Sequence, residues 1–339
     1  MATLGIHHVT AIAGDAQRNL HFYAGVLGLR FVKRTVNFDD PGTYHFYFGD
    51  ATGSPGSILT FFPWPGAHAG RAGVGQAAVT ALAIPPTSLG WWLERLVAHG
   101  VRHDMPARRC GGEQALAFRD PDGLLLELVA HPGALAREGW GGGPVPAEHA
   151  IRGVHGVTLW EDGLEETSAL LTGQLGFRAL TSEGNLFRFA AGDAVPGAFV
   201  DVRCAPDFWQ GTTGVGAVHH VAFRVGDDAA QLALRDALAG HGLNVTPPLD
   251  RQYFRSVYFR EPGGVLFELA TDAPGFLIDE PFEALGAALK LPPQYERMRG
   301  DLERVLSPID VGAALRAASA SAHASAHESA FHSLPGDSV

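Results

Sequence analysis

Apolar and polar residues alternate in short segments that recur four times along the chain. Residues 6–12 (IHHVTAI) form the first such segment, and related segments begin at residues 77, 152 and 216. Alternation with a period of two is typical of a β-strand that buries one face. Each segment is followed by a stretch with helical spacing, over residues 16–28, 87–100, 165–176 and 228–242. Further apolar runs separated by glycine-rich turns then complete each repeat.

Glycines and turn motifs mark the ends of the predicted elements. Every predicted helix ends at a glycine, as a left-handed C-terminal cap requires: Gly28, Gly100, Gly176 and Gly242. The motifs DPDG at Asp120 and EPGG at Glu261 supply the residues of tight turns and predict closing hairpins. Each repeat is therefore predicted to be a βαβββ module.

The predicted fold class is α+β, with four βαβββ modules paired to form two barrel-like cups. We expect an N-terminal domain of two modules over residues 1–133 and a C-terminal domain of two modules over residues 151–277. The Gly/Pro-rich residues 134–150 read as a linker, and residues 278–310 as an extension with one helix. Residues 311–339 are low in complexity, rich in Ala, Ser and His, and predicted to be disordered.

Composition narrows the class of protein. With 339 residues, 46% of them hydrophobic and 18% charged, the chain has the composition of a globular protein with room for two cores. A net charge of −11 argues against nucleic acid and anionic membranes as partners. No run of about 18 apolar residues and no secretory signal is visible, so we expect a cytoplasmic protein. Two cysteines, Cys110 and Cys204, do not suggest a disulfide framework.

Two of the four opening strands carry a pair of adjacent histidines. Because side chains alternate across a strand, only one histidine of each pair can face into a given cup. His219 shares its face with Val221 and Phe223, which favours packing, whereas His220 shares its face with small or polar residues. The repeat register matches His220 to His8, so we assign His8 and His220 as metal ligands, with their neighbours behind them.

An acidic ligand is predicted on a closing strand. Glu268 lies in the apolar run VLFELA, where an unpaired carboxylate would be costly to bury. Glu127 occupies the matching position of module 2, but that module has Ala78 and Val79 in place of the histidines, so we interpret Glu127 as structural. A complete ligand set forms only if module 1 pairs with module 4. Module 2 would then pair with module 3 in a metal-free cup.

Two histidines and one carboxylate on one face, with the other coordination positions open, suit Fe(II) and dioxygen chemistry. Mn(II) or Zn(II) could use the same ligands, because affinity alone does not select the metal. The predicted metal site therefore consists of His8, His220 and Glu268, and the predicted activity is that of a non-haem iron dioxygenase.

Longer motifs resemble one known family. These are HHVT at residues 7–10, VNFDDPGTYHFYFGD and SILTFFPWP in module 1, and HHVAF with SVYFREPGGVLFELATD in module 4. Together they resemble the ring-cleaving dioxygenases of the vicinal oxygen chelate (glyoxalase/bleomycin-resistance/dioxygenase) superfamily, in particular the para-hydroquinone 1,2-dioxygenase branch. The similarity extends to about residue 309.

The resemblance implies ring cleavage of a hydroquinone-type aromatic substrate with O2, in the breakdown of aromatic compounds, and Fe(II) on the three predicted ligands. It also implies supporting roles for five further residues, named His7, Thr10, His219, Arg251 and Tyr258. We expect Arg251 and Tyr258 to stabilise charged oxygen atoms during the reaction. Either His219 or His7 would transfer a proton.

Two other functions use the same superfamily fold. A glyoxalase-like isomerase or lyase needs a metal but no oxygen, and generally has four protein ligands where only three are found here. A non-catalytic protein that binds a quinone or drug usually lacks the ligands and is often half this length. The ring substituents, the native metal and homo-oligomer formation remain open from the sequence.

Overall fold

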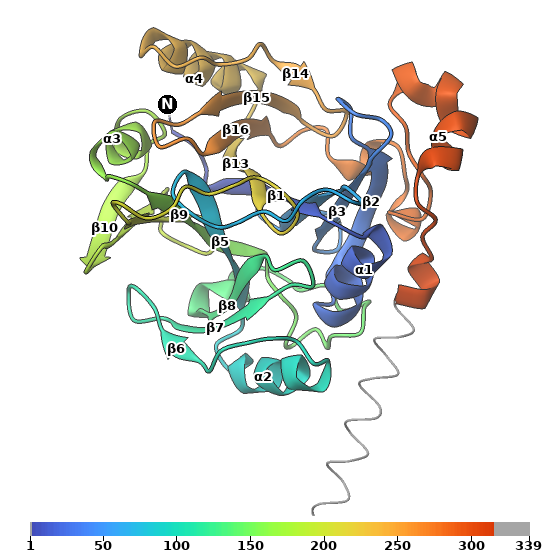
Figure 1. Ribbon diagram of the computed structural model, residues 1–339, viewed down its shortest axis with the longest axis horizontal. Helices are drawn as coiled ribbons and strands as arrows, with labels where there is room; N and C mark the ends of the chain where they lie inside the picture. Colours follow the sequence, from blue (N-terminus) through green and yellow to red (C-terminus); the bar gives the residue numbers. More distant parts are fainter. Residues whose placement is uncertain (1, 315–339) are drawn as a thin grey trace, which may run out of the picture.

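A computed structural model describes residues 2–314 of the chain. Of residues 311–339, which were predicted to be disordered, residues 311–314 are helical and Ala314 is buried, so the prediction is wrong there. Residues 315–339 lie outside the described residues. The predicted α+β class is confirmed: two eight-stranded sheets each curl into a half-open cup, and the helices α1 to α4 lie outside the strands (Figure 1). None of the helices in the described part of the chain is long and apolar enough to cross a membrane.

Modules 1 and 4 build the first sheet, in the order β14-β15-β16-β13-β1-β4-β3-β2. Module 1 consists of β1 (Ile6–Ala13), α1 (Ala16–Leu20), the π-helical turns η1 (His21–Val26), β2 (Arg30–Val36), β3 (Tyr44–Gly49) and β4 (Ile58–Pro63). Module 4 consists of β13 (Val218–Val225), α4 (Asp228–Gly240), β14 (Leu249–Asp250), β15 (Arg255–Arg260) and β16 (Leu266–Thr271). The antiparallel pair β1–β13 joins the two modules, with Val9 opposite Val221.

Modules 2 and 3 build the second sheet, in the order β10-β11-β12-β9-β5-β8-β7-β6. Module 2 consists of β5 (Gln76–Ile84), α2 (Leu89–Ala98), β6 (Ala107–Arg108), β7 (Gln114–Arg119) and β8 (Leu125–Ala130). Module 3 consists of β9 (Val154–Glu161), α3 (Glu165–Gly173), β10 (Arg178–Glu183), β11 (Leu186–Ala190) and β12 (Phe199–Cys204). The predicted pairing of module 1 with 4 and of module 2 with 3 is therefore confirmed.

Local sequence explains most of these boundaries. The glycines predicted to end the four helices all adopt positive φ angles, between +62° and +86°. The helix predicted over residues 16–28 differs in one respect, because it is α-helical only to Leu20 and widens into π-type turns before Gly28. Turns of this kind are uncommon and do not follow from apolar spacing alone.

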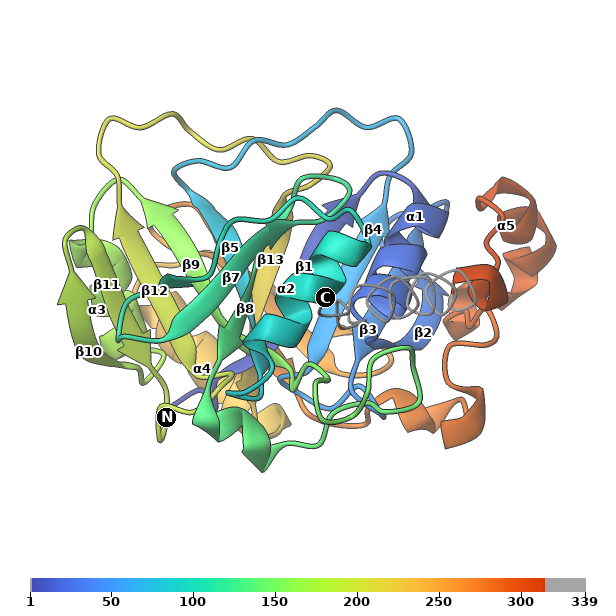
Figure 2. The same ribbon diagram turned by 90° about the horizontal axis from the view of Figure 1, so that it is seen from below.

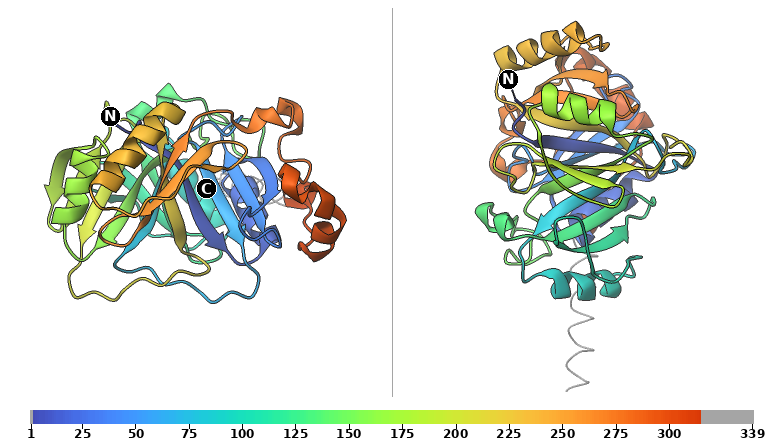
Figure 3. Two further views of the ribbon diagram at one scale, coloured as in Figure 1. Left: turned by 90° about the horizontal axis from the view of Figure 1, so that it is seen from above. Right: turned by 90° about the vertical axis from the view of Figure 1, so that its left-hand side faces the viewer.

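Two loops and a C-terminal extension complete the molecule. Residues 64–75 link β4 to β5, and residues 205–217 link β12 to β13. The two loops run beside each other beyond one end of the strands, bridged at Ala69–Val215 (Figure 2). The short helix η2 (Pro132–Ala136) lies between modules 2 and 3. After module 4 the chain forms the extension, which consists of the helices η3 (Phe276–Ile278), η4 (Phe282–Ala284), η5 (Pro293–Met298) and α5 (Arg299–Val305). This extension lies beside module 1 (Figure 3). The extension is joined to β2 by a hydrogen bond from Lys290 N to Arg34 O.

A buried ion pair fastens the extension to the first cup. Lys33, on β2, has no exposed surface, and its Nζ donates to Asp279 Oδ1 at 2.6 Å and to Glu280. Asp279 Oδ2 also accepts hydrogen bonds from Gln252 Nε2 and the Tyr253 hydroxyl, at 2.8 and 3.1 Å. The extension therefore holds the segment between β14 and β15, which carries Arg251, against the first cup.

Candidate metal centre and substrate pocket

Three neighbouring strands bring the predicted ligands together inside the first cup. His8 comes from β1, His220 from β13 and Glu268 from β16, and all three are at most 4% exposed. The two Nε2 atoms are 3.3 Å apart, and Glu268 Oε2 lies 3.3 Å from His8 Nε2 and 2.9 Å from His220 Nε2. Among residues 2–314, His8, His220 and Glu268 form the single group of three or more His, Cys, Asp or Glu side chains whose ligand atoms all lie within 4.8 Å of one another.

The donor set fits a divalent transition-metal ion. Ligand atoms about 2.1 Å from such an ion are about 3.0 Å apart at right angles and about 3.4 Å apart in a tetrahedron. Two of the three observed separations, both 3.3 Å, lie in this range, and the third, 2.9 Å, is within 0.1 Å of its lower end. Glu268 Oε2 is buried and accepts no hydrogen bond, although both imidazoles lie close to it. A buried carboxylate oxygen without a donor, facing two imidazole nitrogens, is the arrangement that a cation would stabilise.

A second histidine lies within hydrogen-bond distance behind each of the two candidate ligands. His7 Nδ1 lies 2.9 Å from His8 Nδ1, and His219 Nδ1 lies 2.8 Å from His220 Nδ1. The backbone of Thr271 is a hydrogen-bond partner of His7 that acts to raise its pKa. A metal bound at His8 Nε2 would require the His8 proton to lie on Nδ1, and His8 Nδ1 would then donate a hydrogen bond to His7 Nδ1. Partners of this kind orient metal-binding histidines.

The charges in this cluster are those of a ligand set ready for a cation. Burial, followed by the neighbouring His8, lowers the pKa of His7 to about 3. Burial also lowers the pKa of His220. For Glu268, burial works to raise the pKa, but the two imidazoles outweigh it and hold the pKa well below its usual range. A neutral His220 and an ionised Glu268 follow, and Ser256 Oγ donates to the other oxygen of Glu268.

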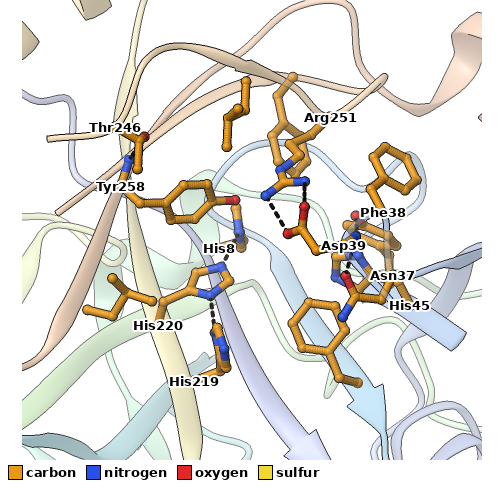
Figure 4. A pocket seen from close by; sticks show the side chains of 15 residues that line it. His8, Asn37, Phe38, Asp39, His45, His219, His220, Thr246, Arg251 and Tyr258 are labelled. Carbon is orange, nitrogen blue, oxygen red and sulfur yellow. Dashed lines mark hydrogen bonds and ion pairs between the residues drawn. The ribbon is translucent and has the colours of Figure 1, made fainter. Parts of the chain in front are cut away.

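A pocket of about 390 Å³ opens onto the histidines from the mouth of the cup. Aromatic side chains form much of its wall, namely Phe38, Phe62 and Phe254. The Phe254 ring lies 5.1 Å from the rings of both His7 and His8. Figure 4 shows His220, Tyr258 and Arg251 projecting into this space from module 4, and Asp39 and His45 from module 1. The pocket is therefore built jointly by the first and the last module.

Arg251 and Tyr258, both predicted site residues, lie side by side in the pocket. The Arg251 guanidinium makes two hydrogen bonds to Asp39, at 3.1 and 2.8 Å, and lies 5.4 Å from the Tyr258 ring centroid. Burial and the nearby Glu268 raise the pKa of Tyr258, while hydrogen bonds with Ser256 and Arg251 act in the opposite direction. Tyr258 therefore keeps its proton at neutral pH and can act as a hydrogen-bond donor.

The remaining predicted residues take different positions. His7 is 2% exposed and enclosed behind His8, as predicted. His219, which the alternation pattern placed in the core, is only partly buried and lines the pocket beside Phe62. Thr10 does not line the pocket; its hydroxyl bonds Thr60 Oγ1 at 2.8 Å. The catalytic and ligand roles of all these residues stay predictions.

Sequence reasoning missed several pocket residues, among them Asn37, Asp39, His45 and Tyr47. His45 and Tyr47 share one face of β3, and the Tyr47 hydroxyl donates to His45 Nδ1 at 2.8 Å while His45 Nε2 bonds Thr60 Oγ1. A polar chain thus runs from Tyr47 through His45 and Thr60 to Thr10. The alternation in YHFYF, with a histidine and a tyrosine on one face, was the signal that could have revealed it.

The second cup holds no corresponding ligand set in the described residues. Glu127 lies opposite Ala81 just as Glu268 lies opposite Ala222, and the two histidine positions are occupied by Val79 and Gly156. Glu127 Oε2 instead lies 3.3 Å from Arg109 Nη1. The geometry agrees with a structural interpretation of Glu127.

Comparison with known proteins places the chain in a family. The model of the Glyoxalase/Bleomycin resistance protein/Dioxygenase superfamily matches residues 5–128 and 153–269. MhqO of Bacillus subtilis, whose name assigns it to the ring-cleaving dioxygenases, is 46% identical over 310 residues, which cover 91% of this chain and 97% of MhqO. The chlorohydroquinone/hydroquinone 1,2-dioxygenase of Sphingobium indicum is 35% identical over 309 residues, covering 89% of this chain and 96% of that enzyme.

Solved structures agree with this placement. A crystal structure from Bacillus subtilis, named as that of a dioxygenase, superposes with a TM-score of 0.86 at 45% identity, covering 91% of this chain and 98% of the other. Glyoxalase I from Zea mays superposes with a TM-score of 0.58 at 17% identity, covering 79% and 92%, and shares the fold alone. The chain therefore belongs to the Glyoxalase/Bleomycin resistance protein/Dioxygenase superfamily.

Proposed function

We propose that the protein is a ring-cleaving dioxygenase that uses Fe(II) held by His8, His220 and Glu268 to open the ring of a hydroquinone-type substrate with O2. The observation that carries the proposal is the buried three-atom ligand cluster at the base of a pocket with aromatic walls. Relatives over nearly the whole chain length, named for ring cleavage and in one case for hydroquinones, support the same reaction class.

The ligand count supports this proposal over a glyoxalase-like isomerase. Three protein ligands on one face leave the opposite positions open for both an aromatic hydroxyl and dioxygen. The chemistry that a ferrous ion at this site supplies is the activation of dioxygen beside a coordinated aromatic hydroxyl. No fourth His, Cys, Asp or Glu ligand atom joins the cluster in the described part of the chain.

The walls of the pocket suit a single aromatic ring. A pocket of about 390 Å³ lies at the lower end of the range of about 300–1,000 Å³ usual for small-molecule sites. Phe62 and Phe254 offer ring faces and edges against which a flat substrate can pack.

The polar side chains of the pocket would bind and polarise the substrate oxygens. Tyr258, which keeps its proton, can donate to an oxygen that gains negative charge, and Arg251 adds a positive charge beside it. The Asp39 carboxylate fixes the Arg251 guanidinium in place. Because Arg251 is held in place before the reaction, its charge can stabilise the developing negative charge without reorganisation of the site.

His219 is the better placed of the two candidate proton carriers. Both nitrogens of His7 have protein partners, His8 and the Thr271 backbone, and the ring is enclosed. With a metal on His220 Nε2, His220 Nδ1 would donate to His219 Nδ1 and the His219 proton would lie on Nε2, and the His219 ring lines the pocket. We therefore assign proton transfer with the substrate to His219 and orientation of His8 to His7.

Oxygen consumption after anaerobic loading with Fe(II) tests the function. Ring cleavage puts both oxygen atoms into the product, so hydroquinone and O2 should disappear one to one. Oxidation to a quinone would instead yield hydrogen peroxide, and added catalase would return oxygen. His220→Ala protein measures the background autoxidation. Absence of catalase-independent uptake across a panel of hydroquinones, in protein shown to hold iron, would refute the proposal. Parallel loading with Mn(II) and Zn(II) tests the choice of metal.

A further inference from the structure

The second cup keeps a cavity although its metal ligands are missing. The cavity has a volume of about 440 Å³ and lies between β5, β8, β9, β11 and β12. Its lining includes Glu127, the counterpart of Glu268, and Val79, the counterpart of His220. Arg109 follows β6 as Arg251 follows β14, and it too lines the cavity. The cavity is therefore the structural counterpart of the substrate pocket, and side chains have not filled it.

The charges at the base of this cavity are already compensated. Arg109 contacts Glu127 Oε2 at 3.3 Å and donates to Asp201 Oδ2 at 2.6 Å. Arg188 pairs with Asp201 and with Glu113. A cation is not needed to stabilise Glu127, because the Arg109 guanidinium fulfils that role.

Two arginines nearer the opening have no such partner. Arg108 and Arg203 both line the cavity, are exposed, and form no ion pair or side-chain hydrogen bond with any residue in the described part of the chain. Glu183 is the other acidic residue of the lining, and its Oε1 accepts a hydrogen bond from Gly111 N at 3.3 Å. Two guanidinium groups at the mouth of a concave surface make a site that attracts anions.

Apolar side chains line the same cavity. Val79 and Leu186 contribute aliphatic surface, and Trp160 contributes an indole ring. Planar guanidinium groups match the geometry of a carboxylate, with two parallel hydrogen bonds to its two oxygens. A cavity of this size can hold a molecule with one ring. The ligand that suits both features carries a carboxylate on an apolar, aromatic body.

We propose that the second cup is a binding site for a small aromatic carboxylate, held by Arg108 and Arg203 at its charged end and by Val79, Trp160 and Leu186 along its ring. The site is separate from the metal centre, and the proposal does not depend on the reaction catalysed there. A charge-assisted hydrogen bond is typically strong enough that each arginine should contribute about tenfold or more to affinity.

Binding of 4-fluorobenzoate to the full chain, followed by fluorine NMR, tests the proposal. Arg108→Gln and Arg203→Gln should each weaken binding by about tenfold or more, since both side chains are exposed and their loss should not affect folding. Arg178→Gln, at an exposed arginine of β10 outside the cavity, is the matched control and should bind as the unchanged protein does. 4-Fluorobenzyl alcohol, which has the ring without the charge, should bind at least tenfold more weakly.

Three results would overturn the proposal. Unchanged affinity in both Arg108→Gln and Arg203→Gln would exclude these side chains as the carboxylate anchor. Loss of binding in Arg251→Gln alone would place the probe in the first cup. Displacement of 4-fluorobenzoate by inorganic phosphate at equal concentration would show a site for anions in general, without a contribution from the apolar lining.

Discussion

Two buried glutamates meet where the second sheet touches a turn of the first, and one of them should destabilise the protein as pH rises. Glu161, at the end of β9, is 1% exposed, and neither of its carboxylate oxygens has a hydrogen-bond partner among residues 2–314. Glu261 is 2% exposed and accepts from Thr167 Oγ1 and Val265 N. A Cβ atom placed on Gly263 would lie 1.9 Å from Glu161 Oε2 and 2.8 Å from Glu261 Oε1. The two carboxylate oxygens are therefore at most 4.7 Å apart.

The size of the effect follows from the pKa of Glu161. Burial, and then the negative charge of Glu261, raises this pKa from 4.5 to about 8. Between these values the folded protein holds a proton that the unfolded chain has released, so the free energy of unfolding falls as pH rises. The slope is about 1.4 kcal/mol per pH unit, and the total approaches about 4–5 kcal/mol above pH 8. Below about pH 4.5 both states are protonated and the effect disappears.

Glu161→Gln removes the ionisable group while it keeps the shape of the side chain. We expect the variant to gain stability over the unchanged protein progressively from pH 5 to pH 8, as measured by urea unfolding at several pH values. Glu166→Gln makes the same chemical change at an exposed position of α3 and should show no such trend. Titrating groups that do not interact with Glu161 or Glu166 are common to all three proteins and cancel in the differences, whereas the coupling of Glu161 with Glu261 is part of the measured effect. A stability difference that stays constant from pH 5 to pH 8.5, or a variant less stable at pH 8.5, would refute the reasoning.

Three further predictions concern the first cup. Glu268→Gln should lower Fe(II) affinity by at least about 100-fold, since one of three ligands loses its charge. The control Glu127→Gln should keep one metal ion per chain. Elemental analysis that finds an equal loss of metal in both variants would contradict the ligand assignment. Tyr258→Phe should retain iron but lose about 10²- to 10³-fold in kcat, and a kcat within about twofold of the unchanged enzyme would assign the tyrosine to packing. Lys33→Met should reduce the free energy of unfolding by about 3–5 kcal/mol, because the buried Glu280 and the partly buried Asp279 lose their cation. A loss below about 1 kcal/mol in urea titration would show that the two carboxylates find other partners.

Local sequence determined the fold class and the three candidate ligands. Alternating strands, helices with a 3.6-residue period and glycine caps are properties of short segments, so they can be recognised without tertiary information. The fourfold repeat added an internal comparison, because a polar residue in one module could be set against its counterpart in the others. That comparison singled out His8, His220 and Glu268, and their number also predicted which modules pair.

Only the tertiary structure decided what surrounds those ligands. Asp39 meets Arg251 across 212 residues of sequence, and Lys33 meets Asp279 across 246. Such contacts depend on the register between β1 and β13 and on loop conformations, such as the positive φ of Gln252 beside Arg251. The alternation of His219 with apolar neighbours predicted that its side chain packs in the core. The same face of β13 lines the pocket near the mouth of the cup, and His219 lies there. A local pattern fixes the face on which a side chain lies, whereas the pairing of distant strands fixes what that face meets.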